Sequence, residues 1–240
     1  MKFPRSILIA ATLSAAQSAT ATPLLTNGGF ETGDFTGWTV TDLAGGNGTW
    51  SVASGTTTPI SGHPTVGAAS GNFYAVTDQL GPGTYALTQN FIVPIGATSV
   101  VLSFDMFANN QAGGAAIINP VGLDHTQGPN QHARVDLLSG SATAFDTGVG
   151  VLDNLFIGAD SGANPNGYTP YMFDITSFIS PGGTFQIRFA ESDNQLFFNQ
   201  GVDNVSVEAR IGASVPEPTT LALLGLGIAG VGFNRRKQLI

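Results

Sequence analysis

The sequence predicts an all-β protein: an antiparallel two-sheet β-sandwich, flanked by an N-terminal signal helix and a short C-terminal apolar helix. Apolar and polar residues alternate with a period of two in several segments, which is the pattern of a strand with one buried face. Clusters of Gly, Asn, Pro and Ser separate these segments, and the chain has 32 glycines and 13 prolines. No stretch of residues 24–212 keeps a helical period for three turns.

Residues 1–21 have the three parts of a secretory signal peptide. Lys2 and Arg5 precede a short apolar run, and the small residues that follow end in Ala19-Thr20-Ala21. This A-x-A pattern predicts cleavage after Ala21. We therefore leave this segment out of the fold and take residues 22–214 as the β-sandwich domain.

Five segments of this domain show strand patterns most clearly. In Ser99–Phe107 the apolar Val100, Leu102, Phe104 and Met106 share one face, and in Thr184–Ala190 Phe185, Ile187 and Phe189 alternate with Gln186 and Arg188. The other segments are 84–93, 132–138 and 202–210, and 174–179 suggests one helical turn. With turn signals between them, eight to ten strands are expected, which favours a two-sheet sandwich.

Residues 215–240 read as a sorting tail. Val215-Pro216-Glu217-Pro218 precedes the uncharged run Thr219–Phe233, and Arg235, Arg236 and Lys237 follow it. A helix of that run spans about 22 Å at 1.5 Å per residue, against a hydrocarbon core of about 30 Å. A short, glycine-rich span with a cationic stop suits a transient hold better than a permanent anchor.

These three parts resemble the PEP-CTERM sorting signal of Gram-negative bacteria. The resemblance implies that signal peptidase and then an exosortase-type membrane protease process the chain, the latter at Pro216-Glu217-Pro218. It also implies an inner-membrane intermediate and a final place at the cell surface or in the extracellular matrix. Such proteins are typical of bacteria that secrete exopolysaccharide, which makes that polysaccharide a candidate partner.

Charge and cysteine content narrow the partners further. Between the two signals stand three arginines, no lysine and fifteen acids, a net charge of −12. Such a surface repels phosphate backbones and argues against nucleic acid, but it suits divalent cations and neutral glycans. The chain has no cysteine, so an exported domain of this size relies on its apolar core rather than on disulfides.

The two ends of the domain resemble jelly-roll domains of the galactose-binding and carbohydrate-binding-module type. The residues that carry this likeness are Leu25–Val40 and the stretch from Asp174 to Val207. The resemblance implies a structural Ca²⁺ with Glu31 and Asp203 as ligands and with carbonyl oxygens near Gly29 or Gly33. The alternative is that Glu31 caps a turn and Asp203 accepts a hydrogen bond from a backbone amide.

Other residues offer weaker candidates for a site. Trp38 and Trp50 could stack on sugars, but each alternates with a valine, which favours the core. Four tyrosines are equal candidates for aromatic residues at the rim of a site: Tyr74, Tyr85, Tyr168 and Tyr171. The long segment 109–131 carries Asp124 and His125, with His132 just after it, and reads as a solvated loop in preference to a metal site.

No catalytic motif stands out. The sequence lacks a G-x-S-x-G elbow, a cysteine nucleophile and an H-E-x-x-H pair. The expected function is a non-catalytic surface or matrix protein that associates with exopolysaccharide. A structural or adhesive envelope protein without a small ligand and a glycan-active hydrolase are the alternatives; two facing carboxylates in a cleft would favour the hydrolase.

Overall fold

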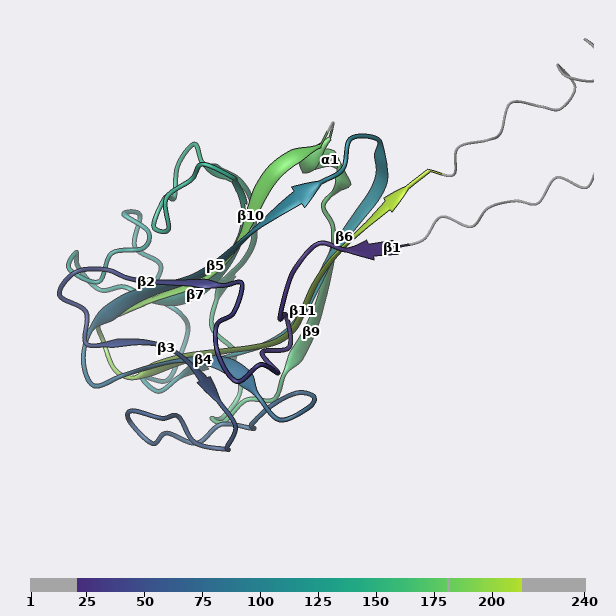
Figure 1. Cartoon of the computed structure of the whole chain (residues 1–240). Coiled ribbons are helices and arrows are strands. Elements are labelled where there is room, and N and C mark those ends of the chain that lie inside the picture. Colours follow the sequence, from purple (N-terminus) through teal and green to yellow (C-terminus); the bar gives the residue numbers. More distant parts are fainter. Residues whose placement is uncertain (1–20, 181, 213–240) are drawn as a thin grey trace, which may run out of the picture. The chain divides into compact units, whose positions relative to one another are not determined.

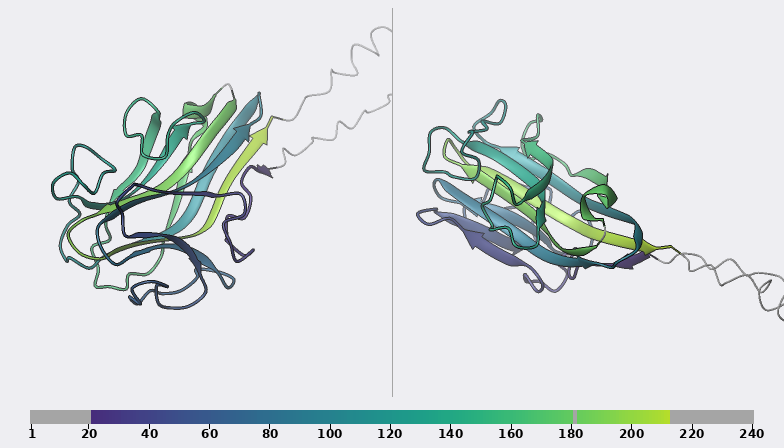
Figure 2. Two further views of the ribbon diagram at one scale, coloured as in Figure 1. Left: turned by 60° about the vertical axis from the view of Figure 1, so that its left-hand side comes forward. Right: turned by 90° about the horizontal axis from the view of Figure 1, so that it is seen from above.

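The computed structural model describes residues 21–180 and 182–212, and within them two antiparallel sheets pack face to face (Figures 1 and 2). The first sheet has the order β3 (Gly48–Ala53), β4 (Tyr74–Gln79), β11 (Phe198–Ile211), β6 (Ala97–Asn110) and β9 (Thr169–Asp174), and β1 (Ala21–Pro23) also pairs with β11. The second has the order β2 (Thr39–Asp42), β5 (Gly83–Val93), β10 (Gly183–Asp193), β7 (Gln131–Ser139) and β8 (Val151–Gly158). The prediction of an all-β two-sheet sandwich is confirmed.

The sequence patterns match these strands closely. The segments 84–93, 99–107, 132–138, 184–190 and 202–210 fall within β5, β6, β7, β10 and β11, and the expected single turn is α1 (Thr176–Ile179). The two predicted flanking helices and the sorting tail lie outside the described residues. Among the residues that are described, no helix is long and apolar enough to cross a membrane.

The core lies between the sheets, where the inward-facing side chains of both meet. From β6 of the first sheet, Phe104 contacts Phe189 of β10 edge-on, with 5.1 Å between ring centroids. Trp38 lies over the same Phe189 ring at 6.1 Å. Trp38 and Trp50 are 7% and 3% exposed, so both tryptophans belong to the core, as their alternation with valine favours.

The sandwich has two ends that differ in what they carry. At the end that we call the pocket end, β4 turns into β5 at residues 80–82 and β10 turns into β11 at residues 194–197. At the opposite end, which we call the tail end, β5 turns into β6 at residues 94–96, and β11 finishes at Ile211. β5 joins the two ends with eleven residues, about 36 Å at 3.3 Å per residue.

The outer face of the second sheet is covered around Arg188. Arg188 of β10 points outward and is nevertheless fully buried, because the turn between β7 and β8 lies over it. Its guanidinium donates to both Asp136 and the carbonyls of Ala144 and Asp146. Arg134 also pairs with Asp136, at 2.6 Å, so one carboxylate holds two arginines.

The long segment after β6 also covers this face. It runs from residue 111 to residue 130, and Ile117 pairs with Gln131 through two backbone hydrogen bonds. Leu123 packs on Ala86 and Ala190, which point outward from β5 and β10. The prediction of a solvated loop around the histidines is wrong: His125 is 7% exposed and His132, on β7, is fully buried.

Candidate functional site

Glu31 and Asp203, the predicted metal ligands, lie close together beside Gly29. Gly28 brings the loop against β11: its carbonyl accepts from Val205 N, and a Cβ at Gly28 would overlap the Val205 carbonyl. The sequence therefore identified two carboxylates that the fold does bring together.

Both carboxylates accept backbone amides from the turn at residues 69–73. Glu31 accepts from Asn72 and Phe73, and Asp203 Oδ2 accepts from Ala69 and Ser70. Burial raises the pKa of Asp203, amide hydrogen bonds lower it, and the charge of Glu31 raises it further. The hydrogen-bonding alternative is thus what the geometry displays.

The donor chemistry at this pair also fits a hard cation. Glu31 and Asp203 place two carboxylates beside Gly29, and Ca²⁺ binds such oxygens together with carbonyls and water. Within the described residues, no three His, Cys, Asp or Glu side chains group as metal ligands, so the pair would need main-chain or water oxygens. Asp124 and His125 belong to no such group: Asp124 Oδ1 accepts from the backbone N–H of Thr126, and His125 Nδ1 lies 3.3 Å from Thr84 Oγ1.

The tyrosines do not form an exposed sugar platform. Tyr74 and Tyr85 are fully buried. Tyr168 is half-buried and donates to the Gly67 carbonyl, and Tyr171 stacks on Phe104 with 5.0 Å between ring centroids. Two of the four rings are buried and the other two are half-buried, so these tyrosines do not line one exposed aromatic face.

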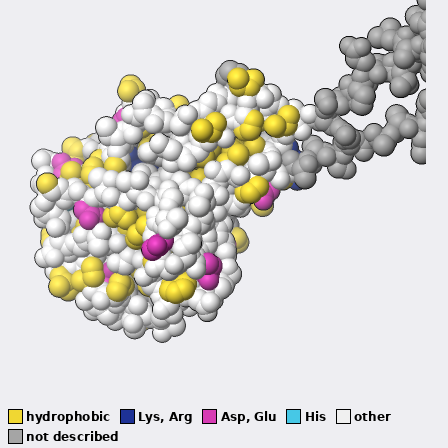
Figure 3. Space-filling view, in the orientation of Figure 1, with side chains coloured by type: hydrophobic (Ala, Val, Ile, Leu, Met, Phe, Trp, Pro, Cys, Tyr) yellow, Lys and Arg dark blue, Asp and Glu magenta, His cyan; other side chains and the backbone are white. Residues whose placement is uncertain are grey.

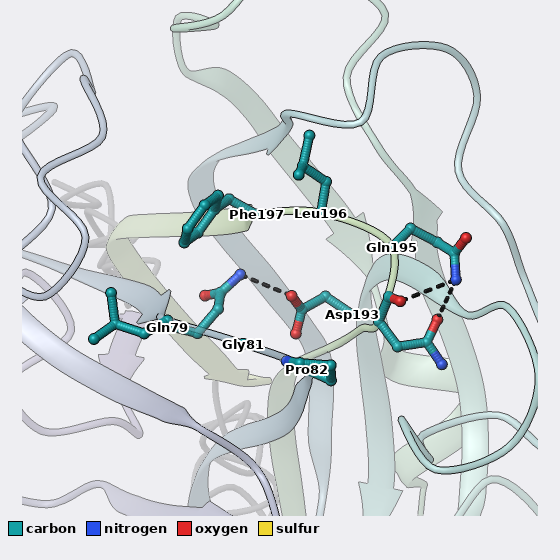
Figure 4. Close-up of a pocket in the computed structure, with 9 residues that line it drawn as sticks. Gln79, Gly81, Pro82, Asp193, Gln195, Leu196 and Phe197 are labelled. Atoms are coloured by element: carbon teal, nitrogen blue, oxygen red, sulfur yellow. Dashed lines mark hydrogen bonds between the residues drawn. The ribbon is translucent and has the colours of Figure 1, made fainter.

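A pocket of about 190 Å³ opens instead at the pocket end, between the β4–β5 and β10–β11 turns (Figure 4). Its lining is Gln79, Leu80, Gly81, Pro82, Asp193, Asn194, Gln195, Leu196 and Phe197. Leu80 and Leu196 are 61% and 50% exposed, so they form apolar walls at the mouth. Gln79 and Asp193 point toward each other at its floor, where Gln79 Nε2 donates to Asp193 Oδ2 at 3.0 Å.

The polar groups of this pocket are fixed by neighbouring elements. Gly83 N donates to Asp193 Oδ1 at 3.0 Å, and Gln79 Nε2 also donates to the Phe198 carbonyl. Asn194 accepts from Asn130 N and donates to the His125 carbonyl, which ties the pocket to the 111–130 segment. A ligand would therefore meet side chains that are already held in place.

Behind the pocket floor lies an interior that is unusually polar. Glu191, two residues before Asp193 on the inward face of β10, is fully buried and accepts from Thr77 Oγ1 at 2.6 Å. Burial and the neighbouring Asp193 raise the pKa of Glu191 well above its usual range. Burial also raises the pKa of Asp193, to about 7, against the hydrogen bonds from Gln79 and Gly83.

Several acceptors around Glu191 have no hydrogen-bond donor in the described part of the chain. They are Glu191 Oε1, Gln79 Oε1 and Gln200 Oε1. A protonated Glu191 carboxyl brings a donor into this group of acceptors, which is consistent with its raised pKa. Two acids on one strand face coexist because burial raises the pKa of each and so favours their neutral forms.

Sequence reasoning missed this end of the molecule, although a signal was present. The alternation that puts Phe185, Ile187 and Phe189 inside continues to Glu191 and Asp193, which a reading that stopped at Ala190 did not follow. Two acids on the buried face of a strand are rarely tolerated without partners, so they mark a special environment.

Comparison with known proteins identifies the tail. Residues 214–237 match the model of the PEP-CTERM protein-sorting motif, which indicates an exported protein that is processed at the membrane. The chain thus carries the sorting motif that residues 215–240 resemble. A search of curated proteins found no match.

Solved structures similar to this chain include carbohydrate-binding modules and other proteins. TmCBM61 in complex with β-1,4-galactotriose is 12% identical, over 78% of this chain and 97% of that chain, with a TM-score of 0.47. The K3 cleaved adhesin domain of Lys-gingipain from Porphyromonas gingivalis is 17% identical, over 79% and 99%, with a TM-score of 0.47. A Stig cyclase from Fischerella sp. TAU is 18% identical, over 79% and 98%, with a TM-score of 0.46. With TM-scores this low, these likenesses carry no weight for function.

Proposed function

We propose that this chain is a non-catalytic protein of the Gram-negative cell surface or extracellular matrix, which binds a neutral saccharide of the exopolysaccharide in the pocket at its pocket end. The saccharide proposal rests on the pocket itself, whose exposed lining combines the apolar side chains of Leu80 and Leu196 with the amide of Gln195. Sugars present apolar C–H faces and hydroxyl groups, and a site with both kinds of lining complements them.

The size and charge of the pocket limit the kinds of ligand that it can bind. Its volume of about 190 Å³ is below the roughly 300 Å³ at which drug-sized sites begin. It therefore suits one sugar ring or a chain end rather than a long stretch of polymer. The formal net charge of −12 on the domain disfavours an acidic sugar.

Binding of residues 22–214 to the host's own exopolysaccharide tests this proposal. The variants Leu196→Ala and Gln195→Ala should weaken binding at least several-fold, because each shortens an exposed side chain of the lining. Met172→Ala is the matched control, since Met172 is 76% exposed but lies on β9, outside this pocket. Saturable binding that all three variants retain equally would exclude this pocket as the binding site. No binding by the unaltered domain would favour the structural or adhesive role.

The hydrolase alternative gains no support from the two acids near the pocket. Asp193 lines the pocket, but Glu191 does not, and its carboxyl is fully buried against Thr77. A glycosidase pair needs both carboxyl groups in contact with the scissile bond or its water. The buried acids are better explained as part of the domain interior.

We also propose that Ca²⁺ binds at Glu31 and Asp203 and stabilises the 69–73 turn against β11. Loss of the ion leaves two neighbouring carboxylates that only amides compensate, so a chelator should lower the melting temperature. The double variant Glu31→Gln, Asp203→Asn should remove that chelator effect. A melting temperature that is the same with calcium and with chelator would show that the amides suffice.

A further inference from the structure

The tail end of the sandwich exposes large apolar side chains that the proposed saccharide site does not use. Val149, Ile95 and Ile92 are 101%, 88% and 68% exposed, three of the four most exposed large apolar residues in the described part of the chain. Phe178 and Ile211 add 42% and 50% exposure. Side chains this open are not explained by packing within the domain.

These residues belong to one end of the molecule. Ile95 lies in the β5–β6 turn, and Ala97 just after it pairs with Ile211. Ile92 lies opposite Thr184. Val149 directly precedes Gly150, whose carbonyl accepts from Ser139 N at the end of β7, and Ser139 lies opposite Phe185 at the same end. Figure 3 shows apolar side chains gathered over this end of the sandwich.

The charges at this end differ from those of the rest of the domain. Among the described residues, Arg210 is the exposed cation, because Arg134 and Arg188 are buried on Asp136. It directly precedes Ile211. The nearest acids along β11 and β9 are Glu208 and Asp174, both in register with Val101, about 13 Å inward from Ala97 at 3.3 Å per residue. In the 140–150 turn, the half-buried Asp146 accepts from Gly148 N and Gly150 N.

The chain beyond this end is short. From Ile211 to Thr219, where the apolar run of the sorting motif begins, there are eight residues. Fully extended, they reach at most about 29 Å at 3.6 Å each. Whenever that run is held in a bilayer, the tail end cannot be farther from the lipid surface than this tether.

We propose that the tail end is a membrane-contact surface, which rests on the outer leaflet of the inner membrane while the sorting motif holds the chain there. Val149, Ile95 and Ile92 enter the headgroup region, and Arg210 meets anionic headgroups. The contact places the pocket end away from the lipid. This inference rests on the membrane-held intermediate of the proposed function, but not on the saccharide site.

Site-directed fluorescence tests the contact, because the chain has no cysteine and one introduced thiol is labelled uniquely. The full chain with Ile95→Cys or Val149→Cys, carrying an environment-sensitive dye, is reconstituted in vesicles of phosphatidylethanolamine with a minor share of phosphatidylglycerol. We expect a blue-shifted emission and quenching by a lipid-borne quencher. Leu196→Cys at the pocket end is the matched control and should report water.

Three outcomes would overturn the inference. Water-like emission at residues 95 and 149 as well as 196 would mean no lipid contact. A blue shift without quenching, lost on dilution of protein in lipid, would mean that a second copy of the chain covers this surface. Equal quenching at both ends would mean adsorption without orientation. Each labelled chain must melt like its parent.

The same samples test the saccharide proposal independently of the membrane contact. Quenching at residue 95 without exopolysaccharide binding would leave the membrane contact and remove the saccharide site. Binding without quenching would do the reverse. Arg210→Gln, which leaves the apolar residues in place, should weaken quenching in vesicles with phosphatidylglycerol more than in vesicles without it.

Discussion

Glu191 and Asp193 are buried acids whose charged forms would lower the stability of the fold. Each lies on the inward face of β10, where its neighbours along the face are Phe189 and Ile187. A charged carboxylate there loses its hydration, so folding favours the neutral acid and raises the pKa. The folded-state pKa of Asp193, about 7 against 3.8, means that its contribution to stability is complete below about pH 4 and is lost as the pH rises toward 7.

His132 makes stability depend on pH in the direction opposite to that of Asp193. Burial, and then the charge of Arg134, lower its pKa from 6.5 to about 4. A buried neutral histidine contributes stability that is complete above pH 6.5 and is lost as the pH falls through 4. The two groups therefore oppose each other between pH 4 and 7, and the wild-type profile shows only their difference.

Asp193→Asn should separate the two contributions. Asparagine keeps an acceptor for Gly83 N, and its amide can donate to Gln79 Oε1 after that side chain turns over, which gives up the bond from Gln79 Nε2 to the Phe198 carbonyl. We expect a gain of about 2–4 kcal/mol at pH 7, from three units at 1.36 kcal/mol each as the upper limit, and little change at pH 4. Urea unfolding at both pH values measures this.

Glu208→Gln is the control for that experiment, since Glu208 is an exposed acid on β11. A change for Asp193→Asn that is the same at pH 4 and at pH 7 would mean that Asp193 is not the titrating group.

Gly71 tests how the 69–73 turn is fitted to Glu31. Its φ is +62°, and a Cβ there would overlap the Glu31 carboxylate. Gly71→Ala should therefore cost the left-handed strain of about 1–2 kcal/mol plus a displaced Glu31. Gly62→Ala, with φ of +72° and open space around it, should cost only the strain. Thermal unfolding of both variants measures the difference, and equal losses would refute a tight fit at Glu31.

At the scale of elements, Asp136 joins three strands and a turn. It lies on β7, accepts from Arg134 of the same strand and Arg188 of β10, and also accepts from Asn154 of β8. Arg188 then reaches the 140–150 turn through two carbonyls. One carboxylate thus positions the turn that covers the outer face of the second sheet.

Asp136→Asn should be strongly destabilising, because it removes the carboxylate that pairs with two buried arginines. Breaking a buried ion pair from one side costs about 3–5 kcal/mol. Asp153→Asn on the neighbouring β8 is the control, since Asp153 is not part of this cluster. Urea unfolding of both variants at pH 7 measures the change in the free energy of unfolding. A loss below about 1 kcal/mol for Asp136→Asn would show that water screens the arginines.

The period-two patterns made the strands predictable, but they did not show which outward faces of the strands are covered by turns. Period-two alternation placed Leu102 and Phe104 of β6, and Phe185 to Phe189 of β10, on the inner faces because one residue step always changes the face. The burial of Arg188 and His132 depends on turns far along the chain that fold over an outward face. Likewise, the pocket is made by two turns, 80–82 and 194–197, which are distant in sequence and are brought together by the pairing of β5 with β10 and of β4 with β11.

At the scale of the whole molecule, the two ends have different tasks in our proposal. The pocket end carries the saccharide pocket, and the tail end carries the exposed apolar residues and the last residue of β11. β5 and β10 span the distance between them, about 36 Å for eleven residues. A chain held in the membrane by its tail would therefore present the pocket toward the polysaccharide even before the tail is cleaved.

In our proposal, removal of the tail turns this held form into the surface protein. The span Thr219–Phe233 is fifteen residues, shorter than the roughly 20 that a stable crossing needs, so a brief hold followed by cleavage fits its length. We expect mass spectrometry of the surface protein to find no peptide from residues 235–240. Glu217→Ala should block cleavage and leave the chain in the inner-membrane fraction, whereas the control Glu208→Ala should not. Intact residues 235–240 on surface protein would instead mean that the tail anchors the mature chain, and the apolar tail end would then stay against lipid throughout the protein's life.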